Sequence, residues 1–183
     1  MNKEADVATR TAWNFDVNHS EVVFHATHLI ITDVRGHFRS FDGYVNTDDD
    51  DFDGAEVGFS ADIASIDTNN KDRDNHLRSD DFFNAEKFPK LNFKGNLVKN
   101  GEKYALKGDL TIRDITKPVS LDVAYRGHVK DPFTGVEKAG FKITGKINRF
   151  DFHLKWNVLM EAGGAIVGPE IRIECNVELQ KQS

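Results

Sequence analysis

Alternation of apolar and polar residues runs through most of this chain and restricts the possible folds more than any other feature. In the segment "EVVFHATHL", Val22, Phe24 and Ala26 fall on one side of an extended strand. Successive side chains of a strand point to opposite faces, so the pattern predicts strands with one apolar and one polar face. It recurs over residues 57–63, 104–112, 119–125, 141–147 and 171–179. Such strands fit an antiparallel sheet that is covered on one side only.

Eight or nine such segments, separated by turn signals such as "KNGEK" and "KDPFTG", predict an all-β fold. The uniform runs favour an up-and-down barrel or a two-sheet sandwich. We expect short helices only near residues 70–88 and 155–161. A chain of 183 residues fits one domain, which we place at 11–183 after a disordered segment 1–10.

Charge and cysteine content argue against several classes of function. The net charge is −6, and no basic stripe is present, so a nucleic-acid partner is not expected. The single cysteine, Cys175, excludes an internal disulfide and multi-cysteine zinc patterns. It lies on the apolar side of the last strand segment, which favours a buried, inert thiol.

The first residues, "MNKEADVATRTAW", lack the apolar core of a signal peptide, and no apolar run is long enough to span a membrane. We therefore expect a protein that does not span a membrane. The expected location is the cytoplasm if Met1 is the native start, and the periplasm if a signal peptide was removed.

Small residues recur on the apolar faces of the expected strands. Because protein interiors are densely packed, many small inward residues could leave a hollow for a ligand. They could instead mark bulges, bends or the taper of a barrel. We prefer the ligand-sized hollow. The residues are Ala26, Ala61, Gly95, Gly108, Gly127, Ala139 and Gly145.

The most highly charged stretch, "SIDTNNKDRDNHLRSDDFF" at 65–83, has a structural explanation. Asn69 or Asn70 is a suitable N-cap for a short helix, and Ser79 for a second one. Phe82 and Phe83 would then anchor the two helices onto the sheet. On this interpretation the charges mark helix ends and form ion pairs.

Within this stretch, Arg73, Asp74 and His76 form the one cluster suited to chemistry, and we expect them to contact one another. Elsewhere, alternation places His25 and His28 on opposite faces, where they cannot share a metal. The "DDDDFDG" segment begins like a calcium loop, but its twelfth position is Ser60 instead of the required Glu. We expect no metal, no cofactor and no catalytic residue.

Several motifs together resemble the YceI-like polyisoprenoid-binding family. They are "W-x-F-D-x-x-H-S" at 13–20, "V-R-G-H-F" at 34–38, the stretch that begins "SIDTNNKDRDNHL" at 65, "LTIRDITKPV" at 110–119 and "GFKITGKINRFDF" at 140–152. The resemblance covers residues 11–180. It implies a bacterial protein, a lipocalin-like antiparallel β-barrel of about eight strands, an apolar lumen that holds a long isoprenoid lipid, and a possible homodimer.

Three positions depart from the family pattern, where glycine is usual. This chain has Asn69, Asp114 and His153 there. Asn, Asp and His are the residues other than glycine that most often adopt a positive φ. We therefore expect all three to keep the left-handed backbone conformation.

These observations together predict a binding protein and not an enzyme. The expected ligand is a long-chain isoprenoid lipid of the polyprenyl or isoprenoid quinone type, which the barrel binds, sequesters or transports. The headgroup end is assigned to Arg73, Asp74 and His76. The expected lumen residues are Phe24, Phe38, Phe59, Ile63, Phe93, Leu106, Leu110, Val123, Phe141, Ile173 and Cys175.

Elementary physics is consistent with that ligand, and two other functions stay open. A strand of about ten residues extends roughly 33 Å, and burying about twenty methylene equivalents gives roughly 16 kcal/mol before ordering costs. One alternative is an enzyme that modifies a lipid headgroup with His28 or His76. The other is a stress-related scaffold with a filled core and no ligand.

Overall fold

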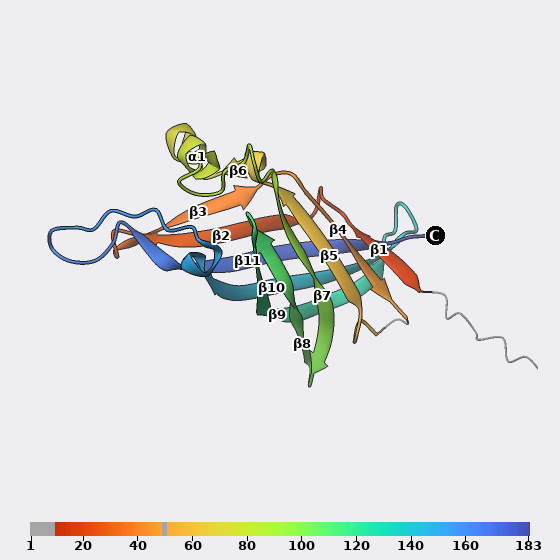
Figure 1. Ribbon diagram of the computed structural model, residues 1–183. Helices are drawn as coiled ribbons and strands as arrows, with labels where there is room; N and C mark the ends of the chain where they lie inside the picture. The colour runs from red at the N-terminus through yellow and green to blue at the C-terminus, as the bar shows by residue number, and fades with distance from the viewer. Residues whose placement is uncertain (1–9, 49–50) are drawn as a thin grey trace, which may run out of the picture.

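One antiparallel sheet of eleven strands forms the body of the protein (Figure 1). This computed structural model describes residues 10–48 and 51–183. The strands are β1 (Thr11–Phe15), β2 (Glu21–His28), β3 (Thr32–Phe38), β4 (Phe41–Thr47), β5 (Glu56–Asp62), β6 (Ile66–Asp67), β7 (Lys90–Asn100), β8 (Lys103–Ile112), β9 (Ile115–Lys130), β10 (Glu137–Asn148) and β11 (Val167–Lys181). The one α-helix of the described residues is α1 (Lys71–Arg78), and two 3₁₀ turns span Ile63–Ser65 and Arg149–Phe152.

The sheet closes because β1 pairs with β4 on one side and with β11 on the other. This ring contains eight strands in the order β1, β4, β5, β7, β8, β9, β10 and β11. The expected all-β antiparallel barrel is therefore confirmed. Strands β2, β3 and β6 extend the sheet from the N-terminal part of β11.

The number of strands exceeds the expected eight or nine because the first strands of the barrel are interrupted. β2 and β1 follow one another along the same edge of β11, with Glu21 opposite Asn176 and Phe15 opposite Leu179. β3 pairs with β2, and β4 pairs with β1. The break between β3 and β4 therefore lies at the same level of the barrel as the break between β1 and β2.

Helix α1 and the turns at 79–89 lie beside the short strand β6 (Figure 1). The side chain of Asn70 caps the helix by accepting a hydrogen bond from the Arg73 amide at 3.0 Å, as the sequence predicted. Arg78 donates to the carbonyls of Ala64 and Ile66, so its guanidinium fixes the helix to the residues around β6.

The other two expected helical segments are not helical in the described chain, because side-chain hydrogen bonds hold their backbones in turns and irregular structure. Ser79 donates its hydroxyl to the His76 carbonyl and ends α1 instead of starting a second helix. The Arg113 guanidinium donates a hydrogen bond to the Phe82 carbonyl. Residues 155–158 have no regular secondary structure, and an isolated bridge joins Leu159 to Ala165.

The left-handed conformation occurs at two of the three expected positions. Asn69 has φ 61° and His153 has φ 59°. The expectation was wrong for Asp114, because the left-handed residue of the turn between β8 and β9 is its neighbour Arg113, with φ 55°. The two-residue turn therefore takes its positive φ at the first central position.

Three of the seven small inward residues have a structural role in the sheet and do not create a hollow. Gly95 and Gly108 face each other across β7 and β8, and a Cβ on Gly95 would lie 2.2 Å from the Lys107 carbonyl oxygen. Gly127 has φ 127° where the β9–β10 register shifts. These glycines therefore mark a close strand approach and a bulge.

One end of the barrel is filled by large side chains. Phe52, from the β4–β5 connection, packs its ring 5.3 Å from Trp13 and 5.0 Å from Phe141. All three are almost fully buried. This solid end leaves room for a ligand only toward the opposite end of the barrel.

Candidate functional site

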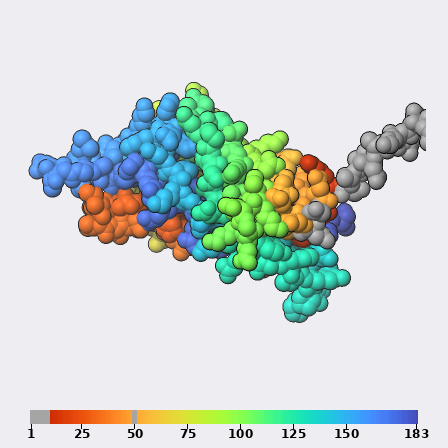
Figure 2. Space-filling view, turned by 90° about the horizontal axis from the view of Figure 1, so that it is seen from below, coloured from red at the N-terminus to blue at the C-terminus, as the bar shows by residue number. Residues whose placement is uncertain are grey.

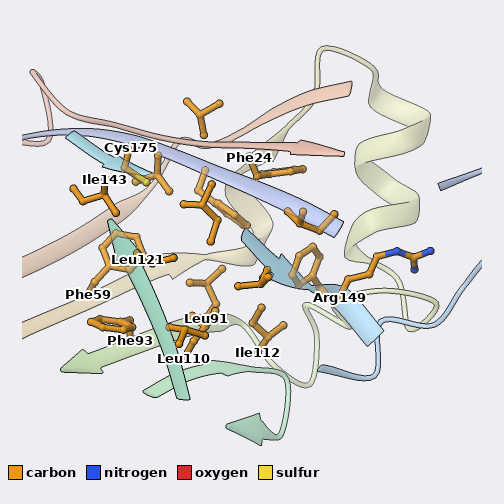
Figure 3. A pocket seen from close by; sticks show the side chains of 18 of the residues that line it. Phe24, Phe59, Leu91, Phe93, Leu110, Ile112, Leu121, Ile143, Arg149 and Cys175 are labelled. Carbon is orange, nitrogen blue, oxygen red and sulfur yellow. The ribbon is translucent and has the colours of Figure 1, made fainter. Parts of the chain in front are cut away.

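A cavity of about 210 Å³ occupies the barrel interior beyond the solid end, and its exposed wall is apolar. Eight of the eleven expected lumen residues line it: Phe24, Phe38, Phe59, Phe93, Leu106, Leu110, Ile173 and Cys175. Figure 3 labels Phe24, Phe59, Phe93, Leu110 and Cys175 among them. They come from β2, β3, β5, β7, β8 and β11, so the cavity is built from the inward faces of strands on all sides. Among the small residues, Ala26 also lines it.

The other three expected lumen residues are buried outside the cavity. Val123 and Phe141 lie in the packed core, and the ring of Phe52 contacts that of Phe141. Ile63 is 2% exposed and belongs to the 3₁₀ turn after β5, where its amide donates to Pro89. Correct alternation put their side chains inward, but it could not show which part of the interior is filled.

Sequence reasoning missed part of the wall. Leu77 of α1 and the two aromatic residues Phe82 and Phe83 line the cavity from outside the sheet. Leu121 and Ile143 do so from β9 and β10. The alternating pattern contained the signal for these two strand residues, whereas the phenylalanine pair was expected only as an anchor.

Arg149 is the charged residue of the cavity lining, and it was not anticipated. It is 2% exposed, and its guanidinium donates to the carbonyls of Leu154, Trp156, Val167 and Gly168. Figure 3 shows this group directed away from the apolar side chains of the wall. Burial lowers the pKa of Arg149. The residue therefore fixes the 154–168 loop at the end of the cavity and presents its methylene groups to the wall.

The proposed headgroup residues Arg73 and Asp74 both bind Thr68. They do not line the cavity, and they do not bind each other. The Asp74 carboxylate accepts from the Thr68 amide at 2.8 Å and from its hydroxyl at 2.6 Å. Arg73 donates to the Thr68 hydroxyl and carbonyl, both at 2.7 Å. The pair therefore holds the chain just before α1 and leaves a headgroup no access to Asp74, which is buried.

His76 lies one layer behind the cavity wall. Its Nε2 is 2.8 Å from the Asp81 carboxylate, and its ring packs edge-on against Phe82 and Trp156. His28, the other histidine considered for headgroup chemistry, is the last residue of β2, opposite Thr32 and Val167. Neither histidine belongs to the cavity lining.

Cys175 faces the centre of the cavity wall between Val22 and Ile143 of the neighbouring strands. Burial raises the pKa of its thiol to about 12. Because the thiolate is the reactive form, this side chain acts as a small apolar group.

One group of ionisable side chains in the described residues has the spacing of a metal site: Asp16, His19 and Glu178. A cation already occupies its centre, because the Lys138 ammonium lies 2.8 Å from Asp16 and 2.6 Å from Glu178. Burial alone would raise the pKa of Asp16, but hydrogen bonds from Lys138 and His19 outweigh it and hold that pKa far below its usual value. The group is therefore an internal ion-pair network.

The acidic segment after β4 likewise forms internal bonds where it is described. Asp51 binds the Lys99 ammonium and the Tyr104 hydroxyl, both at 2.7 Å. Asp53 accepts from the Lys99 amide at 2.7 Å. The first position of the rejected calcium loop, Asp49, and residues 1–9 of the expected disordered segment lie outside the described residues. Arg10 is described and binds Asp48 and Glu56.

No helix among the residues described here has the length and apolar character that crossing a bilayer requires.

Comparison with known proteins gives consistent matches over nearly the whole chain. The model of the YceI-like domain matches residues 13–179. A UPF0312 protein of Staphylococcus epidermidis is 36% identical over 168 residues, which cover 92% of this chain and 96% of the relative. The crystal structure of a Campylobacter jejuni YceI protein is 32% identical with a TM-score of 0.69, covering 86% of this chain and 90% of that one.

A more distant structure shares the fold. The polyisoprenoid binding domain from Saccharophagus degradans aligns with a TM-score of 0.66 at 12% identity, over 94% of this chain and 99% of that domain. At that identity the likeness concerns the fold alone.

Proposed function

The chain belongs to the YceI-like domain family, and we propose that its cavity binds a long-chain isoprenoid lipid. The observation that carries this proposal is the apolar cavity inside the hollow part of the barrel. Apolar surface gains stability when it leaves water, so an aliphatic chain is the natural occupant of such a wall. The shared fold with a polyisoprenoid binding domain supports the same ligand class.

The shape of the cavity favours a single extended chain. Its wall includes Val167 and Val177, ten residues apart on β11, which corresponds to roughly 33 Å along a strand. A volume of about 210 Å³ over such a length is narrow. Within the isoprenoid class we propose a polyprenyl or isoprenoid quinone lipid, with its tail in the cavity and its headgroup at the end near the 154–168 loop.

We propose binding without catalysis. His28 and His76, the two candidates for acid–base chemistry, are not part of the cavity lining. The Cys175 thiol keeps its proton, because burial raises its pKa to about 12. The alternative of a scaffold with a filled core requires large side chains throughout the interior, whereas those of Trp13, Phe52 and Phe141 fill one end only.

Native mass spectrometry and organic extraction of the purified full chain test the proposal. We expect a prenyl lipid to co-purify with the protein. The Cys175→Phe variant should lose it, because the added ring fills the middle of the cavity. Asn176→Phe is the matched control, since Asn176 bonds to Glu21 on the other face of the same strand. Absence of any bound lipid, together with failure of the wild-type protein to take up an added prenyl lipid, would contradict the proposal.

A further inference from the structure

Two loops meet beyond the end of the cavity that Arg149, Leu154 and Val167 line. One is the turn between β2 and β3, and the other spans residues 155–166. The Leu29 amide donates to the Ile166 carbonyl at 2.9 Å, and the Ile30 side chain packs beside Gly164. In Figure 2 the blue atoms of the 155–166 loop project beyond the body of the protein, next to the orange β2–β3 hairpin.

Aliphatic side chains are exposed on both loops. The exposed fraction is 84% for Ile31, 80% for Leu159, 66% for Ile30, 48% for Val158 and 36% for Leu29. We call these five residues the apolar tip. Soluble proteins rarely gather exposed aliphatic groups in one place unless the surface meets a partner.

The backbone of the apolar tip is strained by the residues it carries. Leu29 and Ile30 are the two central residues of the hairpin turn, which the Ile31 amide closes on the His28 carbonyl at 3.2 Å. Their φ angles are 51° and 67°. Such turns favour Asn-Gly, and a β-branched residue at positive φ is an outlier. The chain therefore places exposed aliphatic groups where its own folding favours small or polar ones.

We propose that the apolar tip inserts into the interfacial layer of a lipid bilayer. This inference rests on the proposed function, because a membrane is where a cavity for a long lipid would obtain or deliver its ligand. The position of the apolar tip fits that role. Leu154 and Val167, at the two ends of the loop that carries Leu159, both line the cavity.

Area and charge favour a bilayer over a protein partner. Five partly exposed aliphatic side chains offer less surface than the roughly 800 Å² that each partner buries in a stable protein interface. Residues 29–31 and 156–160 contain no charged side chain, while Lys155 and Glu161 flank the second segment with opposite charges. An uncharged projection suits the apolar layer of a membrane and needs no anionic lipid.

An exposed aromatic residue elsewhere on the surface provides a matched control. Phe133, in the turn between β9 and β10, is 96% exposed. Figure 2 places that turn at the other end of the molecule from the 155–166 loop. Phe133 should therefore contribute nothing to docking of the apolar tip.

Co-sedimentation of the full chain with sucrose-loaded phosphatidylcholine vesicles tests the inference. We expect wild type to sediment with the vesicles. The Ile31→Asn/Leu159→Asn double variant should bind at least about tenfold more weakly, because asparagine does not gain the transfer free energy that an aliphatic side chain gains on leaving water. Phe133→Asn should bind like wild type. Thermal melts verify that both variants are folded, and Trp156 fluorescence should shift to the blue only when the apolar tip binds.

Several results would overturn the inference. They are a wild-type protein that stays in the supernatant, a double variant that binds unchanged, or binding that needs anionic lipid and disappears with salt. A wild-type dimer that the double variant breaks, without vesicle binding, would assign the apolar tip to a second copy of the chain instead.

The failure of this inference and of the proposed function can be told apart. Lipid taken up from detergent solution should be retained by the Ile31→Asn/Leu159→Asn variant, while Cys175→Phe loses lipid and still sediments with vesicles. If the protein binds vesicles through the apolar tip but never holds lipid, the docking site is supported and the proposed function is wrong.

Discussion

Lys138 joins two carboxylates that reach it from different parts of the chain. Asp16 lies at the interruption between β1 and β2, and Glu178 lies on β11. The side chain of Asp16 is 6% exposed and that of Lys138 is 15% exposed. This contact therefore holds the interrupted edge of the barrel in a place that water barely reaches.

Replacing Lys138 by methionine should lower the free energy of unfolding by about 2 kcal/mol, because Asp16 would keep a buried charge with one cationic partner fewer. Urea denaturation measures the effect. Lys142→Met is the control, since Lys142 pairs with Glu174 at the surface, and loss of an exposed pair costs under about 1 kcal/mol. Equal effects in the two variants would contradict the role given to Lys138.

The same contact predicts a dependence on pH. The folded-state pKa of Asp16 lies well below the ordinary value of 3.8, so in acid the unfolded chain binds this proton before the folded one does. Its stabilising contribution is fully present above about pH 5 and is lost as the pH falls below about 4. The difference in unfolding free energy between wild type and Lys138→Met should therefore shrink from pH 6 toward pH 3. A difference that stays constant would contradict it.

At the scale of single residues, the sequence predicted what depends on local chemistry. Asn70 caps α1, and Asn69 and His153 accept the left-handed conformation, because these preferences belong to the residue itself. Contacts between distant residues could not be predicted. Nothing near Lys138 in the sequence shows that it would bind Asp16, 122 residues away.

At the scale of elements, hydrogen bonds from two arginines explain why two expected helical segments are not helical. Leu154 and Trp156 begin a stretch with helical character, but their carbonyls accept hydrogen bonds from Arg149. Arg113 uses the Phe82 carbonyl in the same way. Carbonyls bound to a side chain from elsewhere are not available for helical hydrogen bonds, so local propensity lost to tertiary contacts in both segments.

Arg149→Met should release the 154–168 loop while the barrel stays folded. The change leaves four backbone carbonyls without their donors, and buried unpaired groups cost about 1–3 kcal/mol each. Hydrogen exchange followed by mass spectrometry should show faster exchange confined to peptides from 150–168. Lys155→Met, an exposed change in the same loop, should leave exchange as in wild type. Faster exchange spread evenly over all strands would show that Arg149 stabilises the barrel as a whole.

At the scale of the whole molecule, alternation predicted an all-β antiparallel fold and most of its inward side chains, but it left a barrel and a two-sheet sandwich open, and only the family resemblance implied the barrel. Alternation could not predict that one end is solid. The reason is Phe52, which follows a run of aspartates in a segment that reads as an exposed turn, yet is 3% exposed against Trp13 and Phe141. One aromatic residue from a connection thus sets where the hollow begins.

That hollow makes compression a test of the molecule. An apolar cavity stays dry when no ligand fills it, and its volume of about 210 Å³ disappears on unfolding. Hydrostatic pressure favours the state of smaller volume, so pressure should unfold the lipid-free protein readily, with a volume change toward the larger end of the usual range of about −20 to −100 mL/mol. The fluorescence of buried Trp13 can follow this transition.

A bound chain, or the ring added in Cys175→Phe, should move the midpoint to higher pressure, while Asn176→Phe should leave it unchanged. Equal midpoints in all these forms would mean that the interior yields no volume when the barrel opens. The cavity proposed to hold a lipid is thus also the part of the fold on which hydrostatic pressure acts.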